Sequence, residues 1–242
     1  MICEEAMAVI NRVVERIRDK ELKVRSLIVF GSAVRGGFKP GVSDVDVLLI
    51  IERLDDLKGE KFEDIGGGLE LGVFTAEQFL ELYYSGDPLA HMVWLEGRAI
   101  YDDGFYEKLK GKGRPEVTEL TLMKLRHWGI KDLAKALRGQ GDPRVRIRSL
   151  HHAVRNFARY RVARDKRVFK ITEEELLGQL DEELSTRYRE FLDRLASDGS
   201  KWEELLAEAL NLMEQLYGGP LPCLNESFCE ATKSPRGKAL KT

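Results

Sequence analysis

The sequence of 242 residues has few cysteines, and they lie near the two ends of the chain: Cys3, Cys223 and Cys229. An odd number of cysteines without metal-type spacing predicts neither a disulfide framework nor a zinc site. A reducing compartment suits such a chain best. We therefore expect the protein in the cytoplasm.

The sequence also lacks a run of about 18 apolar residues, the length that a membrane-spanning helix requires. Its first residues mix acidic and basic side chains instead of placing a basic region before an apolar one, so we expect no export. The 39 Lys and Arg residues nearly cancel the 41 Asp and Glu residues, so the overall charge indicates no polyanionic partner. With 43% hydrophobic residues, the composition is that of a soluble globular protein with a core of its own.

A short apolar run at residues 27–30, rich in β-branched side chains, predicts a buried strand. Gly31 and Ser32 follow it directly. A glycine at the end of a strand lets backbone N–H groups approach an anion closely, and a serine hydroxyl can bind a phosphate. The pair therefore predicts a phosphate-binding turn.

Two aspartates, Asp44 and Asp46, open a second apolar run that ends near Ile51. Because side chains alternate along a strand, both carboxylates are expected on one face. Two neighbouring carboxylates repel each other, and a hard divalent cation with oxygen ligands relieves that repulsion. An Asp-x-Asp pattern alone is more often a solvated strand edge, but here the preceding Gly-Ser turn favours a metal site close to a phosphate.

Gly31-Ser32, eleven residues, and then Asp44-x-Asp46 is a pattern that resembles the signature of the polymerase-beta-type nucleotidyltransferase superfamily. The segment GSAVRGGFKPGVSDVD, residues 31–46, is similar to the corresponding segments of the minimal nucleotidyltransferases and the aminoglycoside adenylyltransferases. The similarity includes Ser43, directly before the aspartates. The similarity is closest over residues 27–51 and continues more loosely to Asp102. It implies an α+β fold, with a small mixed sheet flanked by helices.

Three consecutive glycines, at residues 66–68, precede a third predicted strand, which contains Glu70. A lone acid in an apolar strand is costly to bury unless it is paired or metal-bound. In the family that the chain resembles, the third carboxylate lies on this strand, so the resemblance implies that Glu70 binds metal or accepts the proton of an acceptor hydroxyl. The family more often has aspartate here. The alternative is a glutamate on a solvent-facing position of the strand.

The resemblance implies a division of roles among eight residues. Asp44, Asp46 and Glu70 would be catalytic and would bind two Mg²⁺ or Mn²⁺ ions, and a nucleoside triphosphate would be the donor substrate. The triphosphate would be held by the following residues: Gly31, Ser32, Arg35, Lys39 and Ser43. Of these, Arg35 and Lys39 are only candidate charge partners, because basic loop residues are usually just solvated.

The apolar spacing after residue 104 is helical with no further strand signal, which predicts an all-helical bundle. We place a nucleotidyltransferase domain at residues 1–104, the helical bundle at 105–218 and a flexible tail at 219–242. Capping boxes at Thr172 with Glu175 and at Ser200 with Glu203 predict two helix starts.

One segment of the bundle, residues 144–170, contains ten Lys or Arg residues and one acid, Asp165. It could meet a triphosphate or an RNA backbone. It could equally balance residues 173–208, which hold twelve acids against four bases. Arg146 and His151 have a spacing seen in HEPN ribonucleases but lack the polar residue that usually follows the arginine.

Three hypotheses of function remain open at this point. The first is a metal-dependent enzyme that transfers a nucleoside monophosphate, AMP from ATP, to a hydroxyl group of a small molecule and releases pyrophosphate. The second keeps this chemistry but modifies a protein, as antitoxin-type minimal nucleotidyltransferases do. The third is a nucleotide-binding regulatory protein without turnover. The length and domain order resemble those of the aminoglycoside-modifying members of the family, and this resemblance favours a small-molecule acceptor. RNA is a weaker alternative.

Overall fold

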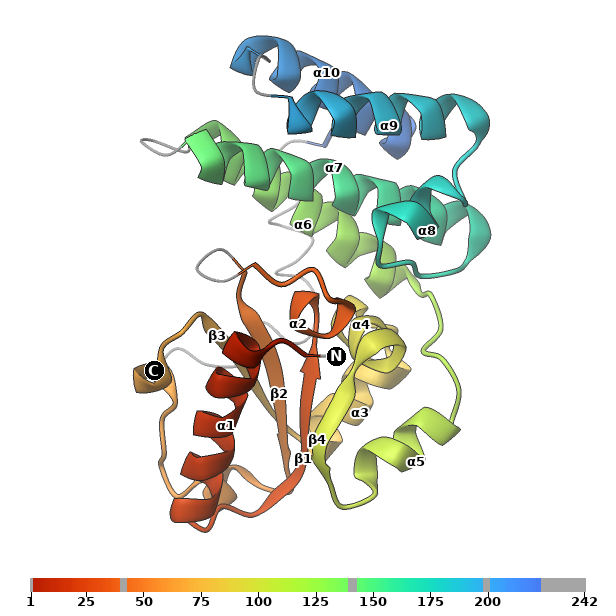
Figure 1. The fold of residues 1–242 in the computed structure, drawn as a ribbon. Coiled ribbons are helices and arrows are strands. Elements are labelled where there is room, and N and C mark those ends of the chain that lie inside the picture. The colour runs from red at the N-terminus through yellow and green to blue at the C-terminus, as the bar shows by residue number, and fades with distance from the viewer. Residues whose placement is uncertain (1, 40–42, 139–142, 198–200, 223–242) are drawn as a thin grey trace. The chain divides into compact units, whose positions relative to one another are not determined.

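The computed structural model describes residues 2–39, 43–138, 143–197 and 201–222. By its internal contacts the chain divides into two compact units, Met1–Glu116 and Val117–Thr242. The described residues of the first unit form a sheet with flanking helices, whereas those of the second unit are helical (Figure 1). The predicted α+β class, with an all-helical second part, is confirmed.

The sheet of the first unit is mixed and has the strand order β3-β2-β1-β4. Strand β1 pairs antiparallel with both β2 and β4, and β2 pairs parallel with β3. The strands have these bounds: β1 Val24–Phe30, β2 Val45–Ile51, β3 Leu69–Thr75 and β4 Arg98–Asp102. The mixed sheet expected from the sequence is therefore present.

The connection from β2 to β3 makes their parallel pairing possible, because parallel neighbours need a crossover rather than a tight turn. It contains two short 3-10 helices, Leu54–Leu57 and Glu63–Ile65. The three glycines at residues 66–68 then all adopt positive φ, between 65° and 73°. Side chains rarely tolerate this conformation, which explains the glycine run before β3.

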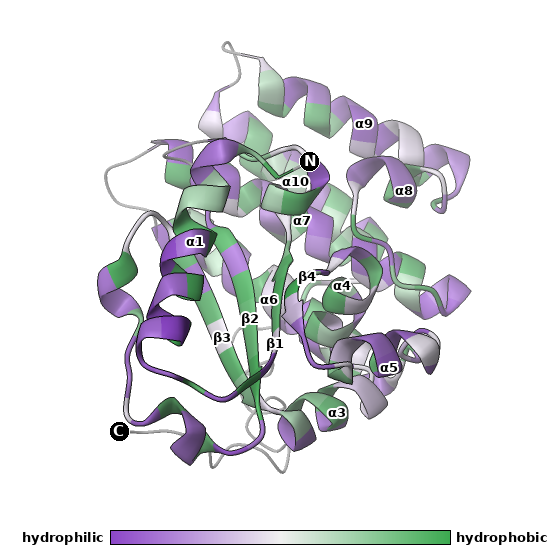
Figure 2. Cartoon of the chain, turned by 60° about the horizontal axis from the view of Figure 1, so that its bottom comes forward, coloured by the Kyte–Doolittle hydropathy of each residue, from purple (hydrophilic) through white to green (hydrophobic). Residues whose placement is uncertain are grey.

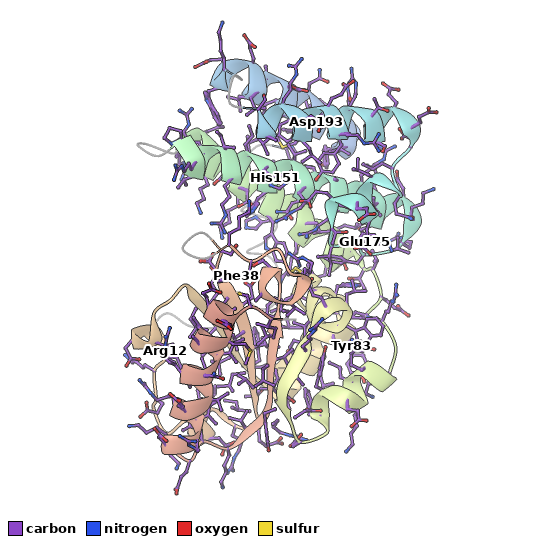
Figure 3. All side chains as sticks on the ribbon, in the orientation of Figure 1. Arg12, Phe38, Tyr83, His151, Glu175 and Asp193 are labelled. Atoms are coloured by element: carbon purple, nitrogen blue, oxygen red, sulfur yellow. The ribbon has the colours of Figure 1, made fainter. Side chains whose placement is uncertain are left out.

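The sheet carries a helix layer on each face, and alternate residues of β1 and β2 point into different layers. Figure 2 shows that both strands are hydrophobic over most of their length. On one face, Leu27 and Val47 pack with α1, Glu4–Asp19. On the other face the core includes residues of α3, Ala76–Tyr84, and α4, Pro88–Glu96. Arg12 on α1 and Tyr83 on α3 mark the two layers in Figure 3.

Helix α5, Phe105–Gly111, belongs to the core of the first unit. Its residues Phe105, Tyr106 and Leu109 are buried against α3 and α4. The sequence analysis placed the domain boundary near Gly104, so the first unit extends beyond that position to Glu116. The apolar residues of this helix have the spacing expected of any amphipathic helix. Their spacing alone therefore does not show whether the helix packs on the first core or on the second.

The second unit packs its helices around one apolar core that includes Phe157, Tyr188 and Met213. Its helices have these bounds: α6 Glu119–Arg138, α7 Pro143–Lys166, α8 Glu173–Leu177, α9 Glu182–Ala196 and α10 Trp202–Tyr217. The capping box of Thr172 with Glu175 is present at the start of α8. Ser200 lies outside the described residues, and the N-cap of α10 is Lys201.

Most of the predicted tail, from residue 223 onward, lies outside the described residues, as do Cys223 and Cys229. Cys3 is a free thiol. Among the helices that the structure describes, none combines the length and the apolar character needed to cross a membrane.

Candidate functional site

The three predicted carboxylates come from neighbouring positions of β2 and β3. Asp44 directly precedes β2, and Asp46 is the second residue of that strand. The parallel register pairs Asp46 with Glu70. Paired residues on neighbouring strands share a face of the sheet, so the structure brings the Asp46 and Glu70 side chains to one edge of the site.

The carboxyl group of Asp46 is strongly perturbed. Burial is the main cause and raises its pKa from the ordinary 3.8 to about 7. The negative charges of Glu70, Asp44 and Glu96 raise the pKa further, in that order. The positive charge of Arg35 opposes them only in part. Burial and like charges disfavour the ionised form of this carboxylate, and a bound cation would favour it.

Gly31 is pressed against Asp46 and permits no side chain. An added Cβ would lie 2.1 Å from Asp46 Oδ2, and the backbone has φ 76° and ψ −151°, a region that is essentially restricted to glycine. Gly31 caps the single-turn helix α2, Ser32–Arg35, in which the N–H groups of Val34 and Arg35 donate to the Gly31 carbonyl. The predicted turn thus begins in close contact with the Asp46 carboxylate.

Of the other predicted phosphate-binding residues, Lys39 and Ser43 close the loop before Asp44. Lys39 N–H donates to Ser43 Oγ at 3.0 Å, and Ser43 N–H donates back to the Lys39 carbonyl oxygen at 2.8 Å. Residues 40–42, between them, lie outside the described residues. Ser43 therefore shapes the loop, and the Lys39 side chain extends from an exposed position.

Glu70 is exposed, which overturns one part of the reasoning that selected it. The cost of burying a lone acid does not apply to a solvent-facing position. What remains is its place opposite Asp46 in the register, together with its charge, which raises the pKa of Asp46. A proton acceptor for an incoming hydroxyl must be accessible, so exposure is compatible with that role.

Glu96, the last residue of α4, is a site residue that the sequence analysis did not single out. Its side chain is only 10% exposed. Glu96 Oε1 accepts the Gly31 N–H at 2.9 Å, and Oε2 accepts from Arg35 Nη1. The sequence gives no sign of this contact, because residues 31 and 96 are far apart and the glutamate ends an ordinary helix before Gly97.

The fit of these residues to a metal depends on the substrate. Within the parts of the chain that the structure describes, no group of three or more His, Cys, Asp or Glu side chains is arranged to hold an ion. Mg²⁺, however, commonly takes one or two carboxylates together with substrate phosphates rather than an all-protein cage. Asp44 and Asp46 offer oxygen ligands beside the expected phosphate turn, so the donor set fits a Mg²⁺ that arrives with a nucleotide.

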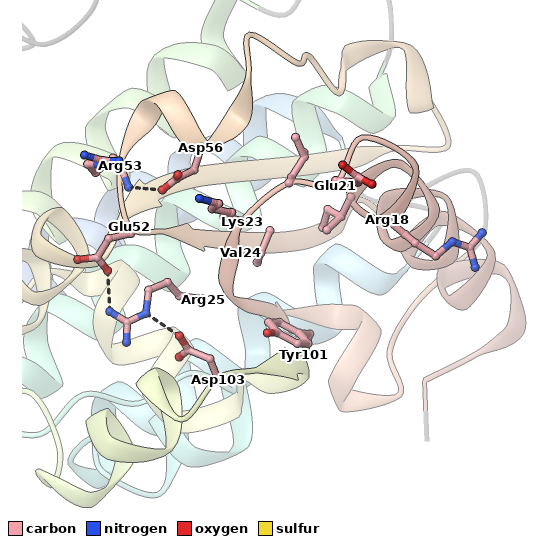
Figure 4. Close-up of a pocket in the computed structure, with 12 residues that line it drawn as sticks. Arg18, Glu21, Lys23, Val24, Arg25, Glu52, Arg53, Asp56, Tyr101 and Asp103 are labelled. Carbon is pink, nitrogen blue, oxygen red and sulfur yellow. Dashed lines mark hydrogen bonds and ion pairs between the residues drawn. The ribbon is translucent and has the colours of Figure 1, made fainter.

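A groove of about 680 Å³ lies elsewhere on the first unit and is lined by residues such as Lys23, Arg25 and Tyr101 (Figure 4). Arg25 crosses it and pairs with Glu52 at 2.7 Å and Asp103 at 2.8 Å. These residues belong to the opposite ends of β1 and β2 from Phe30 and Asp46. The groove is therefore separate from the three predicted site carboxylates, Asp44, Asp46 and Glu70.

Much of the basic segment 144–170 is neutralised within the second unit. Several of its cations form ion pairs: Arg155 with Glu173, Arg161 and Arg164 with Asp165, Arg167 with Glu119, and Lys170 with Glu175. Such pairs favour the interpretation in which neighbouring helices balance each other. Whether other cations of this segment contact a substrate stays a hypothesis.

The pair considered for ribonuclease activity makes contacts of a different kind. The Arg146 guanidinium lies 3.9 Å from the centre of the Trp202 ring, and His151 Nε2 lies 3.2 Å from Glu173 Oε1. The neighbouring His151 ring and the charge of Arg155 lower the pKa of Glu173 to about 2. These contacts are those of a packed polar cluster and give no support to an Arg–His catalytic pair.

A comparison with protein families decides the nature of the first unit. Residues 10–100 match the family model described as a nucleotidyltransferase domain. Residues 10–100 are a nucleotidyltransferase domain. The match contains the Gly31 turn, all three predicted carboxylates and Glu96, and it supports a nucleotidyltransferase enzyme.

One solved structure has a similar fold. The nucleotidyltransferase domain and the helices after it resemble the spectinomycin adenyltransferase AAD(9) from Enterococcus faecialis, solved with ATP and spectinomycin. The TM-score is 0.53 at 12% identity, and the alignment covers 88% of this chain and 98% of that one. A nucleotidyltransferase-like protein from Exiguobacterium sibiricum has a TM-score of 0.42 at 15% identity and covers 95% of this chain and 81% of its own. A comparison with curated proteins finds no match.

The pKa of Asp46 predicts how the stability of the metal-free nucleotidyltransferase domain depends on pH. The unfolded chain releases this proton near the ordinary pKa of 3.8, whereas the folded domain keeps it until about 7. Between these values the folded state binds more protons, so the free energy of unfolding falls as pH rises, by at most about 1.4 kcal/mol per pH unit for one proton.

Denaturant unfolding in chelator from pH 4 to pH 8 measures this loss. We expect the Asp46→Asn variant to lack this contribution, so its stability should fall less steeply with pH than that of the wild type. Equal slopes for the two proteins over this range would mean that Asp46 has an ordinary pKa.

Proposed function

We propose that the protein transfers AMP from ATP to a hydroxyl group of a small molecule, with Mg²⁺ or Mn²⁺ bound to Asp44 and Asp46. The observation that carries this proposal is the β2–β3 register, which sets Glu70 opposite Asp46 at the same edge as the Gly31 turn. The adenyltransferase of similar fold was solved with ATP and the small molecule spectinomycin, which supports the choice of donor and of acceptor class.

The reaction assigns one task to each group. The oxygen of the acceptor hydroxyl attacks the α-phosphorus of ATP, the bond from that phosphorus to the bridging oxygen of the β-phosphate breaks, and pyrophosphate leaves. Glu70 accepts the proton of the hydroxyl, which its exposed position at the site permits. Ser32, at the start of α2, would bind the β- or γ-phosphate through its hydroxyl. When bound, the metal ions would neutralise charge on the triphosphate.

To accept the proton, Glu70 must be reachable by the hydroxyl of the acceptor substrate. A proton acceptor works when it comes within hydrogen-bond reach of the hydroxyl in the bound complex. Because β3 lies at the edge of the sheet and Glu70 points to solvent, an acceptor can approach it without displacing a core residue. This access supports a separate, diffusible acceptor, and the same access would admit a hydroxyl of a protein side chain.

The test is a product screen with the full-length protein. ATP, GTP, CTP or UTP labelled at the α-phosphate is incubated with the protein, a divalent cation and a panel of polyhydroxylated small molecules that includes spectinomycin. We expect label from ATP in the small-molecule fraction and none with chelator. Label only on protein would favour the AMPylating alternative, and metal-dependent binding without any product would favour a regulatory nucleotide-binding protein.

A further inference from the structure

We propose that Glu96 is a positioning residue that holds the Gly31–Ser32 turn in the shape that nucleotide phosphates require. This inference rests on the proposed function and adds a residue to its machinery. Glu96 would act through the turn, without contact to the reacting atoms.

One carboxylate holds both ends of a single helical turn. Gly31, whose N–H donates to Glu96 Oε1 at 2.9 Å, is the N-cap of α2, and Arg35, whose guanidinium donates to Glu96 Oε2, is the last residue of α2. A lone turn is unstable by itself, because fixing its first residues gains few hydrogen bonds. A charge-assisted bond at each end compensates for this weakness.

The turn that Glu96 holds is in close contact with Asp46. Asp46 Oδ2 occupies the space where a Gly31 side chain would begin, so a shift of Gly31 opens or closes the space around that carboxylate. Ser32 follows Gly31 directly and moves with it. A loss of the Glu96 contacts should therefore disturb the phosphate-binding serine and the metal-binding aspartate together.

The same contacts reassign two residues of the turn. The Gly31 N–H, which the sequence analysis offered to a phosphate, is donated to Glu96, and the Arg35 charge is neutralised by the same side chain. We infer that Gly31 and Arg35 support the turn, while Ser32 makes the phosphate contact. Arg35→Met should then weaken nucleotide binding no more than Glu96→Ala does.

The chain contains a matched control for this arrangement. Asp103 Oδ1 accepts the Phe105 N–H at 3.0 Å, and Asp103 Oδ2 accepts from Arg25 Nε at 2.8 Å. It thus joins a backbone N–H to an arginine, as Glu96 does, but next to the end of β1 that is remote from Gly31. A structural loss of the same kind at Asp103 should not affect nucleotide binding.

The experiment compares Glu96→Ala, Glu96→Gln and Asp103→Ala by hydrogen exchange of the amides at residues 31–36 and by nucleotide affinity, KM and kcat. We expect faster exchange in Glu96→Ala and a loss of affinity of up to about a hundredfold, as the removal of hydrogen bonds to a charged group can cause. The loss should raise the KM for the nucleotide more than it lowers kcat, because the serine contact exists before and during the reaction. Asp103→Ala should change neither the hydrogen exchange of residues 31–36 nor the nucleotide affinity.

Two further comparisons separate positioning from general stability. Glu96→Ala and Ser32→Ala should be non-additive, because the first variant already misplaces the serine that the second removes. Should Glu96→Ala not fold, Glu96→Gln keeps the acceptor for Gly31 but loses the charge that holds Arg35, so affinity should fall about fivefold to tenfold. Wild-type exchange and affinity in a folded Glu96 variant would overturn the inference.

The result also distinguishes this inference from the proposed function. If the wild type transfers AMP and Glu96→Ala retains its exchange pattern and its affinity, only the role of Glu96 is wrong. If the wild type neither binds nor transfers any nucleotide, the proposed function is wrong, and the positioning role falls with it.

Discussion

Glu70→Gln should bind nucleotide like the wild type and yet lose about a hundredfold to ten-thousandfold in the rate of AMP transfer, the usual cost of removing a general base. The substitution keeps the size of the side chain and removes its charge. Asp44 and Asp46 remain to bind the metal and the nucleotide. Single-turnover transfer at saturating ATP measures the chemical step without the contribution of binding.

Glu77→Gln is the control for this substitution. Glu77 is also exposed and lies in the first turn of α3, beyond the other end of β3, so its loss should leave the rate unchanged. A thermal melt of both variants shows that they are folded. The expected loss would leave about a hundredth of the wild-type rate or less. If Glu70→Gln keeps more than about a third of that rate, another residue takes the proton. Asp64 is a poor substitute, because it pairs with Arg16 at 2.7 Å.

Asp44→Asn and Asp46→Asn should each abolish the metal-dependent part of ATP binding. We expect affinity to fall by more than about a hundredfold, because even the loss of a group outside the coordination shell typically costs about 10- to 100-fold in metal affinity. Calorimetric titration with ATP, in Mg²⁺ and in chelator, measures the difference. The variants should bind in Mg²⁺ no better than the wild type binds in chelator.

The Asp46→Asn variant should also be more stable than the wild type above pH 7 without metal. Burial and like charges oppose the ionised carboxylate, and the neutral amide escapes this opposition. A variant that gains stability while losing affinity cannot have lost function by unfolding. Asp55→Asn, an exposed position after the far end of β2, is the control and should bind ATP normally. Unchanged ATP affinity in both site variants would exclude the metal site.

The sequence pattern predicted the elements that carry the site because local rules determine them. The apolar run before Gly31 and the run after Asp46 became β1 and β2, and in the second unit the capping box of Thr172 with Glu175 begins α8. The alternation of strand residues was sufficient to place Asp44 and Asp46 near each other. Only the register of β2 with β3 was needed in addition to place Glu70.

What the sequence did not predict depends on contacts between distant residues. Glu96 reaches Gly31 only because α4 packs across the sheet and ends beside β1, an arrangement of tertiary structure without a local signal. The membership of α5 in the first unit has the same origin. The argument that Glu70 is costly to bury failed for a related reason. The apolar residues of β3 suggest a buried strand, but β3 lies at the edge of the sheet, and Glu70 is exposed there.

The close packing of Gly31 against Asp46 limits the order in which this fold can lose its activity. A side chain at residue 31 would collide with the aspartate, so a mutation there is harmful while the aspartate remains. Loss of the aspartate would remove this collision, but the backbone at residue 31 would keep a conformation that is essentially restricted to glycine. In chains of this fold that have lost catalysis, we therefore expect the glycine to outlast the aspartate.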